Sequence, residues 1–361
     1  MSRRAVIATS VVAAFVAVAV WLAWYFGLIF TNPTVSGATV VDVPTSSVRA
    51  VASDLEAPWG IAFLPDGTAL VTERDSTRVL SVTPEGATTE VARIAEARPS
   101  GEGGLLGIAV APTYASDRWV YVYYTAADDN RIARLRLGSG DAPEPIFTGI
   151  PKAGNHNGGR IAFGPDGLLY VGTGDASDRD GAQDRAFLGG KILRLTADGQ
   201  PAPGNPFPNS PVYSLGHRNV QGLAWDSSGQ LFAAEFGQNR YDELNRIESG
   251  GNYGWPTVEG TGGGGDFIDP VATWATSDAS PSGIAIVNDR VYIACLRGTK
   301  LYRVGTDGSG AAAMLTDEYG RLRAVAPAPD GSLWILTSNR DGRGDPAPTD
   351  DRILRLDSSA L

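Results

Sequence analysis

The stretch IAFGPDGLLYVGTGD, residues 161–175, contains the pattern that decides the fold. Two short apolar runs, IAF and LLYVG, flank the turn PDG. In such a turn Pro fixes φ, Asp caps its own backbone and Gly accepts a positive φ. Apolar runs of this length joined by a tight turn are typical of a β-hairpin. The stretch therefore predicts two antiparallel strands near the middle of the chain.

This hairpin is repeated along the chain. Six copies of its first strand have an apolar start, at Ile61, Ile108, Ile161, Leu223, Ile284 and Val325. Successive starts lie 47, 53, 62, 61 and 41 residues apart. A four-stranded propeller blade takes roughly 40–50 residues. Basic-apolar runs such as KILRL (191–195) and RILRL (352–356) close several of the units. The sequence therefore predicts an all-β, six-bladed β-propeller.

The composition agrees with that fold and restricts the function. The 361 residues include 45 glycines and 23 prolines, which suit many short strands joined by tight turns. A net charge of −10 argues against a nucleic-acid partner, although an acidic surface can still contain a basic pocket for a small anion. The single cysteine, Cys295, allows no intramolecular disulfide and is best explained as a buried small hydrophobe.

The N-terminal residues are of a different kind. Residues 5–30 include no charged residue over 26 positions, more than the roughly 20 that span a hydrocarbon core. Arg3 and Arg4 on the short flank indicate a cytoplasmic N-terminus. We expect a transmembrane signal anchor at 1–31, a flexible tether at 32–47 and an extracytoplasmic propeller at 48–361. A cleaved signal peptide ending at VSGA (35–38) and a twin-arginine export signal are the weaker alternatives.

Five stretches stand outside the repeat, and most lie beside the first strand of a unit. They are SGEGGLLG (100–107), GNHNGGR (154–160), LGHRNVQG (215–222), EFGQNRYDELNRIESGGNYGWP (235–256), and a set of three arginines, Arg297, Arg321 and Arg323. Loops beside the innermost strands of a propeller can converge at one end of its channel, although they are far apart in sequence. We expect the functional site among these stretches.

Taken singly, these residues have ordinary structural explanations. His156 and His217 can be turn histidines, and an isolated arginine is usually a solvated charge. Taken together, they indicate a ligand. GRLR places Arg321 and Arg323 on one side of an extended chain, which with Arg297 suits a ligand that carries several carboxylates. Backbone carbonyls in the EFGQN turn suit a hard cation such as calcium.

LGHRNVQGLAW, GGNYGWP and HNGGR together resemble the soluble, pyrroloquinoline quinone (PQQ)-dependent glucose and aldose sugar dehydrogenases of the glucose/sorbosone dehydrogenase family, from about Leu55 to Leu356. These relatives are six-bladed propellers. The resemblance implies an oxidoreductase that oxidises the C1 hydroxyl of an aldose to a lactone. His156 matches the general base, which takes the hydroxyl proton while hydride passes to the quinone. Arg218 and Asn219 match the pair that contacts the quinone oxygens.

The resemblance also implies the remaining ligand contacts. Arg297, Arg321 and Arg323 match the residues that grip the PQQ carboxylates, and Gly237 and Gln238 match the positions whose carbonyls hold Ca²⁺. Glu102 matches a substrate-side position that is often Gln, and Asn155 falls where relatives often have an orienting Asp. The implied partners are a small-molecule sugar, the membrane through the N-terminal helix, and an electron acceptor that the sequence does not identify.

Two other functions fit a six-bladed propeller. A calcium-dependent lactonase or esterase requires side-chain carboxylates and Asn around its metal, and it leaves the three arginines unexplained. A non-catalytic binding module is disfavoured because both His156 and the arginine set are present. A nicotinamide enzyme is also disfavoured, since no G-x-G-x-x-G opens a helix after a predicted strand.

Overall fold

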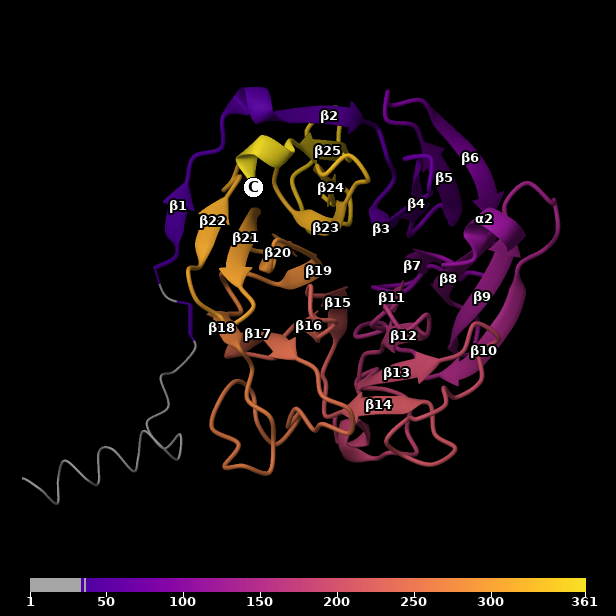
Figure 1. The fold of residues 1–361 in the computed structure, drawn as a ribbon, viewed down its shortest axis with the longest axis vertical. Coiled ribbons are helices and arrows are strands. Elements are labelled where there is room, and N and C mark those ends of the chain that lie inside the picture. Colours follow the sequence, from indigo (N-terminus) through magenta and orange to yellow (C-terminus); the bar gives the residue numbers. More distant parts are fainter. Residues whose placement is uncertain (1–33, 36) are drawn as a thin grey trace, which may run out of the picture. The chain divides into compact units, whose positions relative to one another are not determined.

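The computed structural model describes residues 34, 35 and 37–361, so the transmembrane helix expected at 1–31 lies outside the described residues. Figure 1 shows the described strands arranged as six sheets around a central channel. The six-bladed, all-β propeller expected from the repeat is confirmed. Across residues 34, 35 and 37–361, no helix is long and apolar enough to cross a membrane.

The blades follow one another along the chain, and each runs from the channel outward. Blade 1 contains β3 (Pro58–Phe63), β4 (Ala69–Glu73), β5 (Arg78–Val82) and β6 (Thr88–Arg93), blade 2 contains β7 (Leu105–Val110), β8 (Trp119–Thr125), β9 (Asn130–Arg136) and β10 (Glu144–Ile150), and blade 3 contains β11 (Arg160–Phe163), β12 (Leu169–Gly172), β13 (Lys191–Leu195) and β14 (Val212–Leu215). Blade 4 contains β15 (Val220–Trp225), β16 (Leu231–Glu235), β17 (Tyr241–Arg246) and β18 (Ala272–Ala275), blade 5 contains β19 (Pro281–Val287), β20 (Arg290–Cys295), β21 (Lys300–Gly305) and β22 (Ala312–Met314), and blade 6 contains β23 (Leu322–Pro327), β24 (Leu333–Thr337) and β25 (Ile353–Leu356). The described helical turns are α2 (Tyr114–Asp117) and the 3₁₀ turns η1 (Thr45–Ser47), η2 (Asp180–Gln183) and η3 (Ser358–Ala360).

Two further strands complete the last two blades. β2 (Val48–Ala52) pairs antiparallel with β25 and is the outer strand of blade 6, so strands from both ends of the domain close the ring. β1 (Thr39–Val41) pairs parallel with β22 at the outer edge of blade 5. The expectation of a flexible tether over 32–47 is therefore wrong for β1, because its backbone groups pair with the edge of β22.

The six apolar starts of the repeat all lie on the innermost strands, β3, β7, β11, β15, β19 and β23. Their side chains pack between neighbouring blades, as Ile61 does with Leu336 of blade 6 and Ile161 with Leu106 of blade 2. Cys295 is a buried free thiol in the same kind of core, as expected.

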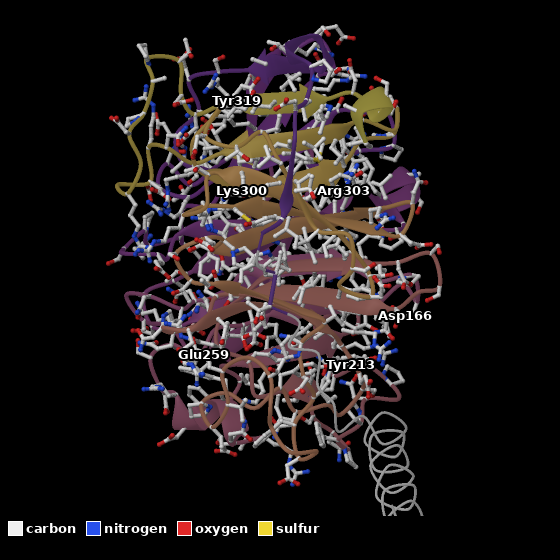
Figure 2. The ribbon with its side chains drawn as sticks, turned by 90° about the vertical axis from the view of Figure 1, so that its left-hand side faces the viewer. Asp166, Tyr213, Glu259, Lys300, Arg303 and Tyr319 are labelled. Atoms are coloured by element: carbon white, nitrogen blue, oxygen red, sulfur yellow. The ribbon has the colours of Figure 1, made fainter. Side chains whose placement is uncertain are left out.

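The topology brings distant loops to one end of the channel. In each blade the innermost strand is antiparallel to the second strand, so the loop before the first and the loop after the second lie at the same end. Figure 2 shows the molecule from the side, with Glu259, Lys300 and Tyr319 toward one face and Asp166, Tyr213 and Arg303 toward the other. The loops that the repeat does not need gather at the face that carries Glu259.

Candidate active site

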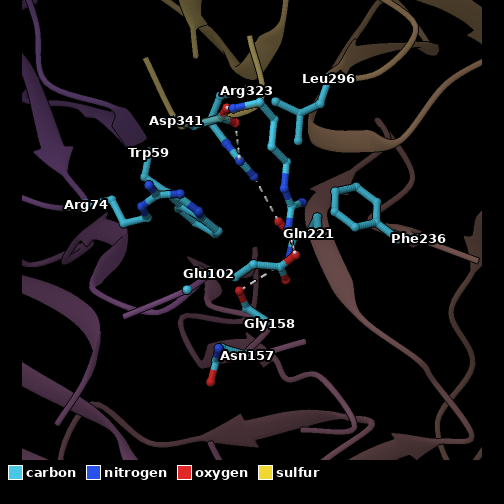
Figure 3. Close-up of a pocket in the computed structure, with 12 residues that line it drawn as sticks. Trp59, Arg74, Glu102, Asn157, Gly158, Gln221, Phe236, Leu296, Arg323 and Asp341 are labelled. Carbon is cyan, nitrogen blue, oxygen red and sulfur yellow. Dashed lines mark hydrogen bonds and ion pairs between the residues drawn. The ribbon is translucent and has the colours of Figure 1, made fainter. Parts of the chain in front are cut away.

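A cavity lies at this end of the channel, and Figure 3 shows side chains converging on it from several blades. It is lined by Trp59, Arg74, Gly101, Glu102, Asn157, Gly158, Gln221, Phe236, Leu296, Arg323, Asp341 and Arg343. All six blades contribute to this lining. Among the residues expected from the sequence, Glu102 and Arg323 line the cavity directly. His156 is linked to this lining by a hydrogen bond from its amide to Glu102.

His156 lies in the loop before β11 in a strained backbone conformation. Its φ is +55°, in the left-handed region that non-glycine residues seldom adopt. Its amide donates to Glu102 Oε2 at 3.0 Å. The loop approaches the segment after β12 closely because Gly174 has no side chain, and a Cβ there would lie 2.0 Å from His156 O. Strain of this kind is concentrated at functional sites.

The imidazole of His156 is held from both sides. Nδ1 lies 2.7 Å from Asp175 Oδ1, and Nε2 lies 2.9 Å from Arg218 Nη2. A guanidinium can only donate, so Nε2 accepts the hydrogen bond from Arg218. Nδ1 therefore carries the ring proton and donates a hydrogen bond to Asp175 Oδ1. His156 thus has its basic lone pair on Nε2, which is the tautomer that a general base requires.

Asp175, which sequence analysis did not single out, is the acid that orients this histidine. It is fully buried, and its Oδ2 accepts a hydrogen bond from Trp255 Nε1 at 2.9 Å. Burial raises the pKa of Asp175, but hydrogen bonds from the His156 ring, the Ser177 amide and the Trp255 indole outweigh burial and leave that pKa below its ordinary value. The carboxylate therefore stays ionised at neutral pH.

Asn155 occupies a different place from an orienting acid. Its Nδ2 lies 3.4 Å from His156 Nε2, and its Oδ1 accepts a hydrogen bond from Ser177 Oγ at 2.6 Å. The acid that holds His156 Nδ1 comes from the loop after β12, at Asp175, and not from position 155. Asn155 is left on the Nε2 side of the ring, beside the basic nitrogen.

Arg218 lies in the loop before β15 and places a fixed positive charge beside His156. Besides its contact with Nε2, its guanidinium donates to Phe236 O at 3.1 Å and to Gln238 Oε1 at 2.6 Å. Burial lowers the pKa of Arg218, against the attraction of Asp175 and other nearby acids. The group remains a cation at neutral pH, as arginine does in proteins.

His217, the chain's other histidine, supports this arrangement from within the core. Its Nδ1 lies 2.8 Å from Glu235 Oε1, and its Nε2 lies 2.8 Å from Ser214 Oγ. Glu235 Oε2 also accepts the Arg218 amide at 2.7 Å. Both ring nitrogens of His217 therefore have partners in the core. His217 positions Arg218 indirectly, because it holds the Glu235 carboxylate that accepts the Arg218 amide.

Asn219 offers a free donor next to the site. Its side chain is fully buried, and its Oδ1 accepts from the Gly158 amide at 3.0 Å. Its Nδ2 has no hydrogen-bond partner among the described residues. A buried donor without a partner lowers the stability of the fold by about 1–3 kcal/mol, so such a group calls for an acceptor supplied by a ligand or by solvent. The position suits an oxygen of a bound ligand.

Two of the three expected arginines meet at one carboxylate. Arg321 and Arg323 lie 2.9 Å and 3.6 Å from Asp341 Oδ2, as expected for alternate residues on one side of an extended segment. Arg323 is buried and lines the cavity, whereas Arg321 is not among the residues that line it.

Arg297 is placed differently from the expectation. Its side chain is exposed, and its neighbour Leu296 lines the cavity in its place. Two arginines that sequence analysis did not consider, Arg74 and Arg343, line the cavity as well. The cavity is therefore basic, although the chain as a whole is acidic.

Glu102 and Arg343 form an ion pair across the cavity, with Oε1 and Nη2 2.9 Å apart. Burial raises the pKa of Glu102, but the His156 amide and the charge of Arg343 outweigh burial and leave that pKa below its ordinary value. The acid at the expected substrate position is therefore ionised, and Arg343 neutralises it.

Gly237 and Gln238 form a turn after β16 that is tied down through its amides. Glu259 Oε1 accepts the amides of Gln238, Asn239, Arg240 and Tyr241 at 2.6–3.2 Å. In the described part of the chain, the carbonyl oxygens of Gly237 and Gln238 accept no hydrogen bond, which leaves both for a hard cation. No group of three or more His, Cys, Asp or Glu side chains suited to a metal occurs among the described residues.

Asp242, beside this turn, makes stability depend on pH. Burial raises the pKa of Asp242 to about 7, despite hydrogen bonds from the Gly237 and Ser280 amides. Between about pH 4 and 7 the folded chain then keeps a proton that the unfolded chain has released, so the free energy of unfolding falls as pH rises. Compared with Asp242→Asn, the wild type should lose up to about 1.4 kcal/mol per pH unit in this window. Urea unfolding of both proteins in a chelator, at several pH values within it, measures the difference. A difference that does not change with pH would contradict the assignment.

Comparison with known proteins defines the family. The sequence profile of the Glucose / Sorbosone dehydrogenase family matches residues 55–354, and the chain belongs to this family. The PQQ-bound aldose sugar dehydrogenase of Streptomyces coelicolor is 56% identical with a TM-score of 0.83, and the match covers 86% of this chain and 97% of that one. The aldose sugar dehydrogenase YliI of Escherichia coli is 30% identical over 82% of this chain and 91% of its own. Quinoprotein glucose dehydrogenase B of Acinetobacter calcoaceticus is 31% identical over 59% of this chain and 52% of its own.

Proposed function

We propose that this chain is a PQQ-dependent aldose sugar dehydrogenase, which oxidises the C1 hydroxyl of an aldose to a lactone. The observation that carries the proposal is the row formed by Asp175, His156 and Arg218, in which an oriented base lies beside a fixed cation. The Streptomyces relative, 56% identical and solved with PQQ bound, supports the choice of cofactor.

The residues around the cavity fit an anionic ligand that is rich in acceptors. Arg74 and Arg323 line the cavity, and the Asn219 amide has a buried donor without a partner. The acids in the lining, Glu102 and Asp341, are already ion-paired with arginines. These donors suit the carboxylates and quinone oxygens of PQQ. When bound, PQQ accepts the hydride that leaves C1 of the sugar.

His156 and Arg218 have separate roles in the reaction, proton abstraction and stabilisation of negative charge. For His156 to act as base, its Nε2 exchanges the Arg218 contact for the C1 hydroxyl and takes the hydroxyl proton. Asp175 accepts a hydrogen bond from Nδ1–H throughout and stabilises the imidazolium that forms. Arg218, released from Nε2, can then donate to an oxygen on which negative charge develops.

Opening of the Glu102–Arg343 pair widens access to the cavity, because both residues line it. With this pair closed, the cavity measures only about 50 Å³, which is too small for a tricyclic cofactor. The Arg343 side chain is 63% exposed and can swing into solvent, whereas Glu102 is held by the His156 amide. Solvent screens the Arg343 end of this pair, and Glu102 keeps the hydrogen bond from the His156 amide when the pair opens, so opening costs less than breaking a fully buried pair.

Calcium and a membrane location belong to the same proposal. The unengaged carbonyls of Gly237 and Gln238 support a calcium ion beside the cofactor. The uncharged residues 5–30, preceded by Arg3 and Arg4, support an anchor with the propeller outside the cytoplasm. The lactonase alternative is less well supported, because Glu102 and Asp341 in the cavity pair with arginines and do not surround a metal position.

The test of this function is reconstitution of the purified full-length protein in detergent. We expect aldose-dependent reduction of an artificial dye only after both PQQ and Ca²⁺ are added, and loss of activity when either is left out. Binding of PQQ without dye reduction by any aldose in a panel of hexoses and pentoses would contradict the dehydrogenase assignment.

A further inference from the structure

One position of the repeat departs from the others just beneath the cavity. The residue before each apolar start is small in five blades, namely Gly60, Gly107, Gly222, Gly283 and Ala324, and it is Arg160 in blade 3. The innermost strands are crowded at this level, since a Cβ on Gly107 would lie 2.1 Å from Gly159 O and one on Gly222 would lie 2.5 Å from Ser282 O. A guanidinium here calls for an explanation that the repeat does not supply.

Arg160 extends across the channel and is only 9% exposed. Its Nε donates to Gln221 O of blade 4 at 2.7 Å. Its guanidinium carbon lies 4.2 Å from the centroid of the Trp59 ring of blade 1. Its Nη2 is 3.3 Å from the point where a Cβ on Gly283 of blade 5 would stand. The side chain therefore separates the cavity from the wider space at the far mouth of the channel, about 500 Å³, which it also lines.

The charge of Arg160 is not compensated by the residues around it. Its Nη2 has no hydrogen-bond partner in the described structure. Burial, and then repulsion by Arg323, lower the pKa of Arg160 to about 9, which still leaves a cation at neutral pH. Arg323 lies over the same Trp59 ring at 5.8 Å, and among the described residues it is ion-paired with Asp341 alone, at 3.6 Å. Arg321 pairs with the same carboxylate, and Arg160 has no acidic partner within 4 Å in the described part of the chain. The charges of the two buried cations Arg160 and Arg323 are therefore only partly compensated, which is costly unless a negative ligand is bound nearby.

We propose that Arg160 places a buried positive charge beneath the bound cofactor. This charge favours the reduced, electron-rich form of the cofactor and so raises its reduction potential. The inference rests on the proposed function, because it requires PQQ in the cavity above. Trp59 and Gln221, which Arg160 contacts, both line that cavity, so the charge lies one residue layer beneath it. Charges in such an interior are poorly screened, and charge near a redox cofactor tunes its electronics.

A purely structural role predicts the opposite behaviour. If Arg160 only fills the channel, its loss lowers stability and leaves the potential of the bound cofactor unchanged. If it is an uncompensated charge, its removal relieves a desolvation penalty in the PQQ-free protein and leaves that protein equally stable or more stable. Stability and potential therefore separate the two roles.

The test compares R160M, R160Q and R160K with the control R136M in the full-length protein. Arg136 lies 4.5 Å from the Trp119 ring on β9, so R136M removes a matched arginine–tryptophan contact away from the channel. We expect the Tm of PQQ-free R160M to equal or exceed that of the wild type. In spectroelectrochemical titration of the PQQ-loaded enzyme, R160M should show at least a tenfold shift toward the oxidised form, about 30 mV for a two-electron couple. R160K should keep the wild-type potential.

The outcomes are distinguishable. An unchanged potential in R160M and R160Q, with normal PQQ binding, overturns the inference and leaves the proposed function standing. Failure of the wild type to bind PQQ overturns both. Failure of R160M and R160Q to fold overturns the inference, because the uncompensated charge predicts PQQ-free variants at least as stable as the wild type. If both fold but do not bind PQQ, R160K keeps the charge without the Nε bond to Gln221. Binding of PQQ by R160K at the wild-type potential then supports the charge role, and loss of binding or a lowered potential in R160K overturns it.

Discussion

Replacing His156 by Gln should lower kcat for aldose oxidation by about 10²–10⁴-fold, which is the contribution typical of a positioned general base. The reason is the loss of the basic Nε2 atom, which is the only ring nitrogen not committed to Asp175. A Gln carbonyl can still accept from Arg218, so the cation stays in place and PQQ affinity should change little. Steady-state dye reduction measures kcat, and a fluorescence titration measures PQQ binding. Activity within threefold of the wild type in a PQQ-loaded variant would remove His156 from the role of base.

Replacing Asp175 by Asn should have an effect of similar size, about 10²–10⁴-fold in kcat, through the tautomer of His156. An amide nitrogen facing Nδ1 donates where the carboxylate accepted, so the ring proton moves to Nε2 and the basic lone pair is lost from the site side. The variant should still fold, because the amide oxygen can accept from Trp255 Nε1, as Asp175 Oδ2 does.

The matched control is Asp166→Asn, at the other end of the channel. Asp166 is also ion-paired, to Arg194 at 2.8 Å, and Figure 2 shows it on the face away from Glu259. This variant should keep the wild-type kcat. If Asp175→Asn retains as much activity as Asp166→Asn, then Asp175 does not set the tautomer of His156.

The fold could be predicted because its information is local and repeated. Each blade begins with the same apolar strand and often has the same Pro-Asp-Gly turn, so six hairpins could be counted from the chain alone. Among the strands that were not located from the sequence are β1 and β2. Both are short, and their partners β22 and β25 lie more than 250 residues away, beyond what local periodicity can indicate.

The site was predicted less completely, for physical reasons that differ between residues. Arg321 and Arg323 were placed correctly relative to each other, because alternation along an extended strand fixes which side chains share a side. Arg297 and Arg343 lie in loops, where spacing does not set side-chain direction, so the first was expected in the cavity and the second was not.

Asp175 was missed although a signal was present. Acids stand at the end of the second strand in blades 1 and 4, at Glu73 and Glu235, and Asp175 follows the second strand of blade 3. These positions lie at the same end of the channel as the loops that carry His156 and Arg218. A comparison of the ends of equivalent strands would have brought the acid and the base together.

The most direct measurement is a single turnover of the PQQ-loaded, full-length wild-type protein with excess aldose and no electron acceptor, compared with His156→Gln. We expect the absorbance of the bound cofactor to change to that of its reduced form in the wild type, with one lactone or its aldonic acid formed per cofactor. The variant, loaded to the same extent, should remain oxidised on the same timescale. A wild-type protein that holds PQQ at one per chain and stays oxidised with every aldose would contradict the proposed oxidation of sugars at this site.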